Sequence, residues 1–283
     1  MTLPVTFLEV VEVCRITPRT ARVVFEAEAL DDSVGAAPDQ QVKLCFPRPG
    51  QRVPELPPQS ADPMGWYQAY LAIPEAARPL LRSFTLRRRR PGTRRVEIDF
   101  VLHGDAGPAA AWAARAAAGQ RLGMVGPSAL YAPAVPFADA AAAADWVLLA
   151  GDETALPAVA TLVGALPAAV PAVVFVEIAD EAERQPLESG AEPVVHWLPR
   201  GGASPGAVLT EAVRAAELPA GRPFVWLAGE AGAVRALRRH LVDGRGVPKA
   251  SIDFTGYWRH RLTQDDAPTA EDLADAQERL SDA

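Results

Sequence analysis

Arg82, Phe84 and Thr85 lie close enough in sequence to hold an aromatic ring system and its phosphates together. The planar guanidinium group of an arginine can bridge a pyrophosphate. An aromatic side chain two residues later can stack on a ring, and a threonine hydroxyl or amide can reach a ring nitrogen. Taken alone, this Arg-x-aromatic-Thr turn is weak support for a binding site, because phenylalanine and threonine in a strand are more often core and edge residues.

A second element with phosphate-binding chemistry begins at Gly107 and Pro108, one predicted strand further along the chain. A helix that begins here would present unpaired amides and the positive end of its dipole, and both suit a phosphate. Each part also has an ordinary explanation, since proline is common at helix starts, Trp112 could be core packing and His103 could be a strand-end histidine. These explanations do not account for the order of the two elements, which together point to a flavin.

A third element runs from Gly151 to Pro157, between an apolar run and a predicted helix. This is where an open α/β sheet binds a nucleotide, although the G-x-G-x-x-G spacing is absent. Asp152 and Glu153 would repel a phosphate unless their side chains face away, so backbone amides and Thr154 would have to bind it. A later apolar run ends at Gly229, which would allow a close backbone approach beside the same cleft.

The elements that must position these residues divide the chain into two halves. In the first half, strand-like runs are separated by turn residues, which predicts a small antiparallel barrel carrying one helix. After an Ala- and Pro-rich connector at 132–144, continuous apolar runs alternate with helices, which predicts a parallel sheet covered on both faces. We expect a β-barrel domain at 1–135, an α/β nucleotide-binding domain at 144–262 and an acidic tail or short helix at 263–283.

Local patterns give the individual elements. We predict strands at 5–13, 21–27, 42–46, 96–102, 121–125, 146–150, 170–178, 194–198 and 224–228, and helices at 109–118, 158–166, 231–242 and 270–280. Residues 47–65 are rich in proline and polar groups and are predicted as a loop. Two acids alternate with apolar residues in 96–102, which predicts a half-buried strand.

An arginine-rich run from Arg87 to Arg95 contains a Pro-Gly turn. We interpret it as the solvated tip of a hairpin whose arginines blunt the strand edges. The alternative is a guide for an anionic substrate or a cofactor phosphate, for which Arg52 is a further candidate. Cys14 and Cys45 lie in apolar strand-like runs and are predicted as small core residues, not as part of a disulfide framework or a metal site.

Bulk composition limits the classes of function. Of the 283 residues, 49% are hydrophobic and 22% are charged, and the mean hydropathy is +0.03, which describes a folded globular protein. The net charge of −7 argues against nucleic acid as the main partner, because such binding needs a broad basic surface. No apolar run reaches membrane-spanning length and the first residues lack the features of a secretory signal, so we expect a cytoplasmic protein without membrane insertion.

Six motifs occur in one order: RSFT at 82–85, FVLHGDAGPAAAWA at 100–113, GDETALPA at 151–158, FVEIAD at 175–180, WLAGE at 226–230 and GYWR at 256–259. Together they resemble the siderophore-interacting protein family, which comprises flavin-dependent ferric-siderophore reductases built like ferredoxin reductases. The resemblance implies an FAD-binding β-barrel followed by an α/β domain, with FAD as cofactor and NADH or NADPH as electron donor. It implies a ferric siderophore as substrate, and we expect a monomer.

The resemblance also assigns site residues by position in this sequence. It implies FAD contacts from Arg82, Ser83, Phe84, Thr85, His103, Asp105, Gly107, Pro108, Ala109, Ala110, Trp112, Thr154, Tyr257 and Trp258. It implies a nicotinamide nucleotide site bordered by Gly151, Asp152, Glu153, Thr154, Glu177, Gly229 and Glu230. No residue is expected to act as a catalytic acid or base or as a metal ligand, because the flavin carries the electrons. Arg259 and Arg261 are the candidates for steering an anionic chelate.

Three departures from the family pattern concern the flavin and the substrate. Phe84 replaces the usual tyrosine and keeps only its stacking face, and Ala110 stands where a serine is common. Ser128 stands where the family tends to have an arginine associated with anionic ferric siderophores.

Two questions stay open at the level of sequence. Glu177 and Asp180 would favour NADH by accepting from a ribose hydroxyl, whereas Arg200 or Arg222 would favour NADPH. A flavoprotein with a different electron acceptor and a non-catalytic protein that binds ferric siderophore are the alternative functions.

Overall fold

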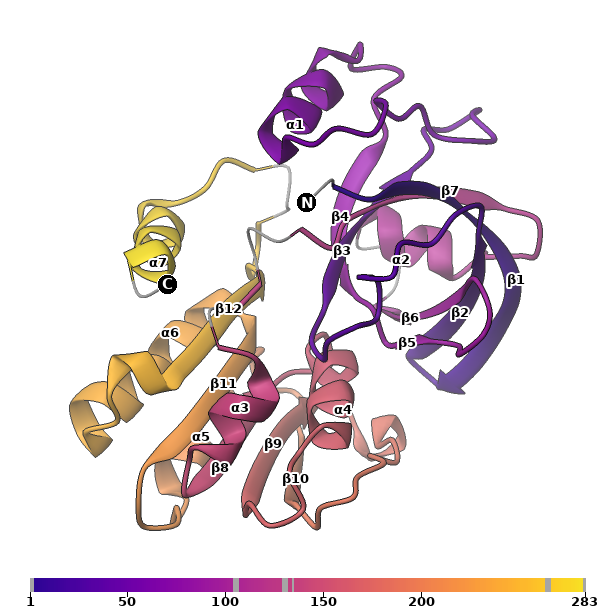
Figure 1. The fold of residues 1–283 in the computed structure, drawn as a ribbon. Coiled ribbons are helices and arrows are strands. Elements are labelled where there is room, and N and C mark those ends of the chain that lie inside the picture. The colour runs from indigo at the N-terminus through magenta and orange to yellow at the C-terminus, as the bar shows by residue number, and fades with distance from the viewer. Residues whose placement is uncertain (1–2, 104–106, 129–131, 134, 263–265, 282–283) are drawn as a thin grey trace. The chain divides into compact units, whose positions relative to one another are not determined.

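The chain forms two compact units, Met1–Ala132 and Pro133–Ala283, which we describe one at a time (Figure 1). The computed structural model describes residues 3–103, 107–128, 132–133, 135–262 and 266–281. None of the helices in these ranges combines the length and the apolar character needed to cross a lipid bilayer.

The first unit is built on an antiparallel sheet of seven strands in the order β4-β3-β7-β1-β2-β6-β5. Its strands are β1 (Val5–Thr17), β2 (Thr20–Ala27), β3 (Gln41–Phe46), β4 (Leu80–Thr85), β5 (Arg88–Arg89), β6 (Arg95–Val101) and β7 (Arg121–Val125). The sheet curls so that β4 and β6 approach each other, with the Phe84 and Phe100 rings 4.6 Å apart. The antiparallel first half is thereby confirmed, but the predicted Arg-x-aromatic-Thr turn is wrong because those residues form β4.

A short helix, α2 (Pro108–Ala113), packs on the core of this sheet. We predicted a helix through Ala118, but regular helix ends at Ala113. The chain then tightens into turns, with Ala116 N donating to Ala113 O at 3.3 Å, and Gly119 takes a positive φ of 84°. Gly119 N donates to Val10 O at 2.9 Å, so pairing with β1 takes over from the helix.

A helix also lies where the sequence predicted the end of a loop. Helix α1 (Pro63–Ala72) begins after Asp62, whose carboxylate accepts hydrogen bonds from the amides of Met64 and Gly65. Trp66 and Tyr70 of this helix are buried in a small second core. An aspartate followed by proline at the first helical position is a recognised helix start, so this signal was present in the sequence.

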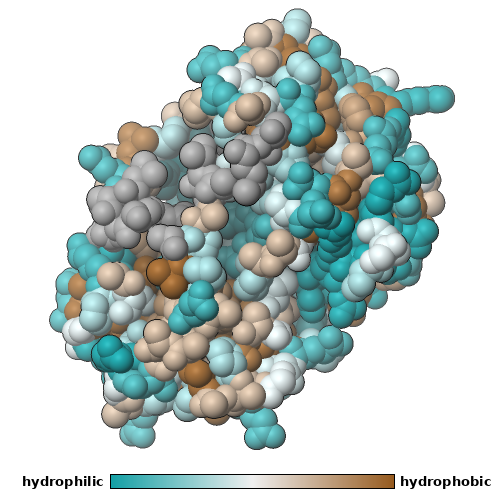
Figure 2. Space-filling view, viewed as in Figure 1, coloured by the Kyte–Doolittle hydropathy of each residue, from teal (hydrophilic) through white to brown (hydrophobic). Residues whose placement is uncertain are grey.

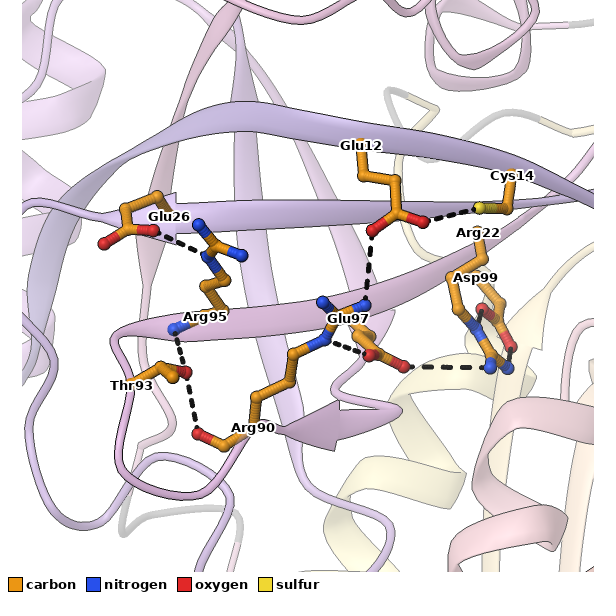
Figure 3. A network of polar contacts seen from close by, with 9 residues as sticks. All are labelled: Glu12, Cys14, Arg22, Glu26, Arg90, Thr93, Arg95, Glu97 and Asp99. Atoms are coloured by element: carbon orange, nitrogen blue, oxygen red, sulfur yellow. Dashed lines mark hydrogen bonds and ion pairs between the residues drawn. The ribbon is translucent and has the colours of Figure 1, made fainter.

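The acids of β6 are buried, so the prediction that this strand is half-buried is wrong. Figure 3 shows the polar contacts that these acids make. Glu97 is 4% exposed and Asp99 is 6% exposed. Arg90 Nε lies 2.7 Å from Glu97, and Arg22 holds Asp99 through two hydrogen bonds of 2.7 and 2.8 Å. The hairpin at Pro91-Gly92 is confirmed, but its arginines are ion-pair partners of the sheet as well as solvated groups.

The same polar network reaches Cys14, which was predicted to lie in the core. Its side chain is partly exposed, and Sγ donates to Glu12 Oε1 at 3.1 Å, whereas Cys45 is fully buried as predicted. Figure 2 shows hydrophilic residues gathered over this part of the first unit.

The second unit is built on a parallel sheet of five strands in the order β10-β9-β8-β11-β12. The strands are β8 (Trp146–Gly151), β9 (Ala172–Ile178), β10 (Val194–Pro199), β11 (Pro223–Glu230) and β12 (Ile252–Trp258). Their helices are α3 (Phe137–Ala142), α4 (Leu156–Gly164), α5 (Ala207–Ala215), α6 (Ala231–Arg239) and α7 (Ala270–Ser281), with short turns η2 (Glu181–Glu183), η3 (His240–Gly244) and η4 (Lys249–Ser251).

Two buried clusters cover the two faces of this sheet. One joins β8 and β9 to α3 and α4, and the other joins the opposite faces of β8 and β11 to α5 and α6. The predicted parallel sheet with both faces covered is therefore confirmed. Strand β12 and helix α5 were not predicted, and α3 lies inside the segment predicted as a connector.

The strand order creates a switch point at the sheet's centre. From β8 the chain proceeds to β9 and β10 on one side and then returns to β11 on the other. The loops that leave the carboxyl ends of β8 and β11 therefore run to opposite sides of the sheet, and open α/β sheets bind nucleotides at such a switch point.

Candidate functional site

Asp152, the residue after β8, is the centre of a hydrogen-bond network at the carboxyl edge of the parallel sheet. Its side chain is buried, with 1% of the residue exposed. Oδ1 accepts hydrogen bonds from the Thr154 amide (2.9 Å) and hydroxyl (2.5 Å). Oδ2 accepts from the Glu230 amide and from the indole Nε1 of Trp258, both at 2.8 Å. One carboxylate therefore joins the ends of β8, β11 and β12.

Gly229 lets this carboxylate approach β11. Its φ is 133°, and a Cβ at this position would lie 2.6 Å from Asp152 Oδ2. Gly151 is equally confined, since its Cβ would lie 2.7 Å from the carbonyl oxygen of Ala228. Both glycines are required here because backbone and carboxylate pass too close for any side chain.

Burial raises the pKa of Asp152 to about 6. Hydrogen bonds from Thr154 and Trp258 act in the opposite direction, and the nearby negative charge of Glu153 adds to the rise. The carboxylate is turned away from solvent and satisfied by four donor groups. The condition that we set for phosphate binding at this turn, an Asp152 side chain that faces away, is met.

Glu153 is neutralised by Arg200, which follows β10. Arg200 donates to both carboxylate oxygens of Glu153, at 2.7 and 2.9 Å, and to Glu177 Oε1 at 3.2 Å. A bidentate guanidinium–carboxylate pair removes most of the repulsion that Glu153 would exert on a phosphate. It also occupies Arg200, which we had considered for a 2′-phosphate.

Glu177 has a different role from the predicted ribose contact. It is completely buried, and its carboxylate accepts hydrogen bonds from the amides of Gly206 (2.8 Å) and Leu209 (3.0 Å) at the start of α5. A buried carboxylate that caps a helix has no free lone pair facing a ligand. Asp180, two residues after β9, is exposed, and its Oδ1 accepts a hydrogen bond from the Ala182 amide (2.9 Å) at the start of η2. Its contact with a ribose hydroxyl stays a prediction.

Arg222 lies at the wrong end of the sheet for a nucleotide contact. It precedes β11, where its amide donates to Asp145 Oδ2 at 2.6 Å, and its side chain is 82% exposed. The interpretation of Arg222 as a 2′-phosphate ligand is therefore wrong.

Glu230 and the end of β12 complete this edge. Glu230 caps α6 through Ala233 N (2.9 Å) and accepts a hydrogen bond from His260 N (3.1 Å). Trp258 is half-buried and fixed by its bond to Asp152, whereas the neighbouring Tyr257 packs edge-on against Trp226 at 6.5 Å. The β11–β12 pairing shifts register at this point, with Gly229 opposite Gly256 and Glu230 opposite Trp258, so Tyr257 lies at the shift.

Arg259 is engaged within its own unit. Its guanidinium donates to Asp272 Oδ2 (2.9 Å) in α7 and to the carbonyl oxygens of Ala267 (2.9 Å) and Asp266 (3.0 Å). Arg261, the second predicted substrate residue, is exposed.

In the first unit, two of the four predicted motif residues on β4, Arg82 and Ser83, interact with a lysine that sequence reasoning missed. Arg82 is 8% exposed and donates to Leu81 O at 2.8 Å, while Lys43 Nζ donates to Ser83 Oγ at 2.5 Å. Desolvation and then the charge of Arg82 lower the pKa of Lys43, although part of that side chain reaches solvent. Lys43 is identified by its position opposite Ser83 in the β3–β4 pair, and this pairing is seen only in the structure. Thr85 is buried.

Phe84 and Trp112 both belong to an aromatic cluster. The half-buried Phe84 lies against Phe100 and, at 6.2 Å, against Phe46. Trp112 contacts Phe46 at 5.5 Å and Phe100 at 5.6 Å. Trp112 packs on the core, in line with the ordinary explanation that we weighed, but like Phe84 it is only half-buried, and its predicted FAD contact stays a prediction.

The start of α2 carries the remaining predicted FAD residues. Gly107 is exposed with a φ of 112°, and among the residues that the structure describes a Cβ there would meet nothing within 4 Å and no side chain caps the helix. Pro108 and Ala109 are half-buried and Ala110 is buried. His103 is exposed, and Asp105 lies outside the described residues.

These residues fit a flavin nucleotide in kind. Arg82 supplies positive charge on the same face of β4 as the half-buried Phe84 ring, and among the described residues the start of α2 has no side-chain cap and leaves room near its amides. Across the described ranges, no group of three or more His, Cys, Asp or Glu side chains is placed to hold a metal ion.

An antiparallel sheet unit followed by a parallel-sheet α/β unit defines the ferredoxin-reductase-like class of FAD- and nucleotide-binding folds. A ferredoxin reductase of carbazole 1,9a-dioxygenase has this fold, with a TM-score of 0.62 and 16% identity over 90% of this chain and 70% of that one.

Within that class, the chain belongs to the siderophore-interacting protein family. Residues 9–131 match the siderophore-interacting FAD-binding domain and residues 144–261 match the siderophore-interacting protein model. A siderophore utilization protein from T. fusca is 37% identical, covers 93% of this chain and 96% of its own, and superposes with a TM-score of 0.74. The ferric vibriobactin reductase ViuB of Vibrio cholerae is 29% identical over 81% of each chain. The predicted family, fold and FAD-binding character are confirmed.

Proposed function

We propose that this protein is a flavin-dependent reductase that uses NAD(P)H to reduce a ferric siderophore and release ferrous iron. The observation that carries the proposal is the carboxyl edge of the parallel sheet. There, Asp152 is buried and satisfied and Glu153 is paired with Arg200, so the backbone of 151–155 is free of unpaired negative charge. The match of residues 9–131 to an FAD-binding domain supports the second half of an electron path.

In this proposal the first unit binds FAD through Arg82 and Phe84, which share one face of β4. Arg82 would bind phosphate oxygens, and Phe84 would support the ring system while its other side rests on Phe100. When bound, FAD accepts a hydride from the nicotinamide and passes electrons on singly. The residues of the chain orient the reactants and exclude water, and none of them needs to take or give a proton.

The substrate chemistry follows from the iron. A hydride carries a pair of electrons, so each NAD(P)H reduces a pair of ferric chelates and releases one proton in total. Hard oxygen chelators hold ferric iron more tightly than ferrous iron, so reduction frees the metal.

We further propose NADH as the preferred donor. Asp180 is exposed after β9 and its Oδ1 accepts from the Ala182 amide, and there its negative charge would repel a 2′-phosphate while its carboxylate would also accept from a ribose hydroxyl. Arg200 would attract that phosphate, but Glu153 and Glu177 already neutralise it.

An anaerobic titration tests the function. FAD-loaded protein is mixed with NADH or NADPH while flavin absorbance is followed, and ferric chelates are then added with ferrozine to detect ferrous iron. We expect bleaching, faster with NADH, followed by reoxidation and a ferrous signal. Bleaching without a ferrous signal would identify a flavoprotein with another acceptor, and chelate binding without bleaching would identify a non-catalytic siderophore-binding protein.

A further inference from the structure

Helix α7 lies beyond the family match, which ends at residue 261 (Figure 1). Its first turn is closed by reciprocal hydrogen bonds, with Thr269 N donating to Asp272 Oδ2 (2.8 Å) and Asp272 N donating to Thr269 Oγ1 (3.2 Å). This capping box gives α7 its own start. The start of α7 is thus fixed by its own hydrogen bonds and not by the preceding strand β12.

Charged contacts hold α7 on its unit. Asp272 pairs with Arg259 (2.9 Å) and with Arg235 of α6 (3.4 Å), and Asp275 pairs with Arg235 (3.1 Å). Among the α7 side chains that the structure describes, those of 270–277, none is buried, and Leu273 is 60% exposed. Most helices dock by burying an apolar face, whereas the described part of α7 docks through carboxylates.

Arg235 and Arg259 together hold one carboxylate of α7. The pair presents two guanidinium groups to one carboxylate, that of Asp272, whose two oxygens they share. The side chains are only 16–26% exposed, so solvent screens this attraction incompletely. A site that binds the carboxylate of its own chain has the geometry and charge to bind an external anion.

We propose that α7 is an electrostatic strap that occupies the Arg235–Arg259 site and competes with an anionic ferric chelate for it. The competition rests on the proposed function, because it assumes that this chain binds a ferric siderophore. The carboxylate of Asp272 is tethered to the chain and therefore acts at a high effective concentration. A weakly charged chelate gains no binding free energy by displacing it, whereas a strongly anionic chelate does. The strap therefore selects for anionic chelates and lowers their apparent affinity.

Gallium chelates test the strap without electron transfer, because gallium(III) is not reduced under these conditions. FAD-loaded full-length protein is titrated with an anionic gallium tris-catecholate and an uncharged gallium tris-hydroxamate. For Asp272→Asn we expect roughly threefold tighter binding of the tris-catecholate, equivalent to an exposed ion pair of about 0.6 kcal/mol, and no change for the tris-hydroxamate. Hydrogen exchange of the amides in 273–281 should become faster in the same variant.

Two matched variants isolate the contact. Glu271→Gln removes one charge from the same turn, where Glu271 is exposed and hydrogen-bonds Thr269, and should behave as wild type. Asp275→Asn leaves the capping box intact and should give part of the effect. Arg259→Gln should abolish the gain produced by Asp272→Asn.

Three outcomes would overturn the strap: unchanged exchange of α7 amides in both aspartate variants, faster exchange without tighter tris-catecholate binding, or equal effects of Glu271→Gln and Asp272→Asn. Failure of the proposed function shows differently, as flavin that NAD(P)H does not bleach, and the gallium titration requires no nicotinamide.

Discussion

At Asp152, burial and hydrogen bonding pull the protonation equilibrium in opposite directions. Four donor groups favour the carboxylate, yet desolvation prevails and the pKa rises from 3.8 to about 6. Thr154 provides the hydroxyl that can turn to accept a proton from Oδ1, whereas the Glu230 amide and the Trp258 indole can only donate. Protonation at Oδ1 therefore keeps Trp258 in place.

This shift predicts a pH-dependent stability with a definite sign. The unfolded chain loses the Asp152 proton near pH 3.8, whereas the folded chain keeps it until about pH 6. The folded state binds more protons in this window, so the contribution of Asp152 to the free energy of unfolding falls by about 3 kcal/mol as pH rises through it. Urea unfolding of Asp152→Asn should lack this fall, and the exposed Asp243→Asn should retain it. Parallel profiles for wild type and Asp152→Asn would contradict the assignment.

Phe84 carries the second prediction for a single residue. Its ring packs on Phe100 and is only half-buried, so its free side is available for stacking. Phe84→Leu keeps an apolar side chain but removes the π-face, and we expect FAD binding to weaken by about tenfold, or about 1.4 kcal/mol. Quenching of flavin fluorescence measures the Kd. Phe84→Tyr keeps the ring and should bind at least as tightly as wild type; equal affinities for the Leu and wild-type proteins would exclude stacking.

At the scale of elements, β6 shows what patterning predicts and what it misses. Alternation over 96–102 predicted the strand correctly, but the same alternation predicted solvent-facing acids that are buried beneath arginines. Those arginines come from β2 and from the hairpin end, so strand pairing alone brings them to Glu97 and Asp99. Helix α1 is a different case. Its Asp-Pro start is a recognised signal in the sequence, but the proline content of 47–65 led to the prediction of a loop.

The buried carboxylate of β6 predicts an asymmetry between two ion pairs. Glu97 is buried and bonded to Arg90, so Glu97→Gln leaves a buried polar group poorly matched and should cost about 1–3 kcal/mol. Glu26 pairs with Arg95 at 2.8 Å but its side chain is 35% exposed, so Glu26→Gln should cost less than about 1 kcal/mol. Amide exchange in β2 and β6 reports on this unit alone. A larger loss in Glu26→Gln would contradict the argument.

At the scale of the molecule, the sequence was sufficient for the division into an antiparallel half and a parallel half. A parallel strand is covered on both faces, so its sequence is a continuous apolar run. This distinguishes it from the interrupted apolar runs of the antiparallel half. The strand order could not be predicted from the sequence. The hydrogen-bond and ion-pair partners of the site residues depend on that order, so they could not be predicted either. Glu177 was predicted as a ligand since it ends an apolar strand, but amides at the start of α5 donate hydrogen bonds to its carboxylate. Arg200 reaches Glu153 only because β10 and β8 flank β9 in the sheet.

Our proposed boundary between an FAD-binding domain and a nucleotide-binding domain makes a prediction for the separated parts. The first unit, Met1–Ala132, has its own core, formed by its sheet and α2, and contains Arg82 and Phe84. A fragment of residues 1–132 should therefore fold and bind FAD with a Kd within roughly tenfold of that of the whole chain. Far-UV circular dichroism establishes folding, and flavin fluorescence gives the Kd. A folded fragment without FAD binding would mean that the second unit supplies the principal flavin contacts, and the assignment of Arg82 and Phe84 would fall.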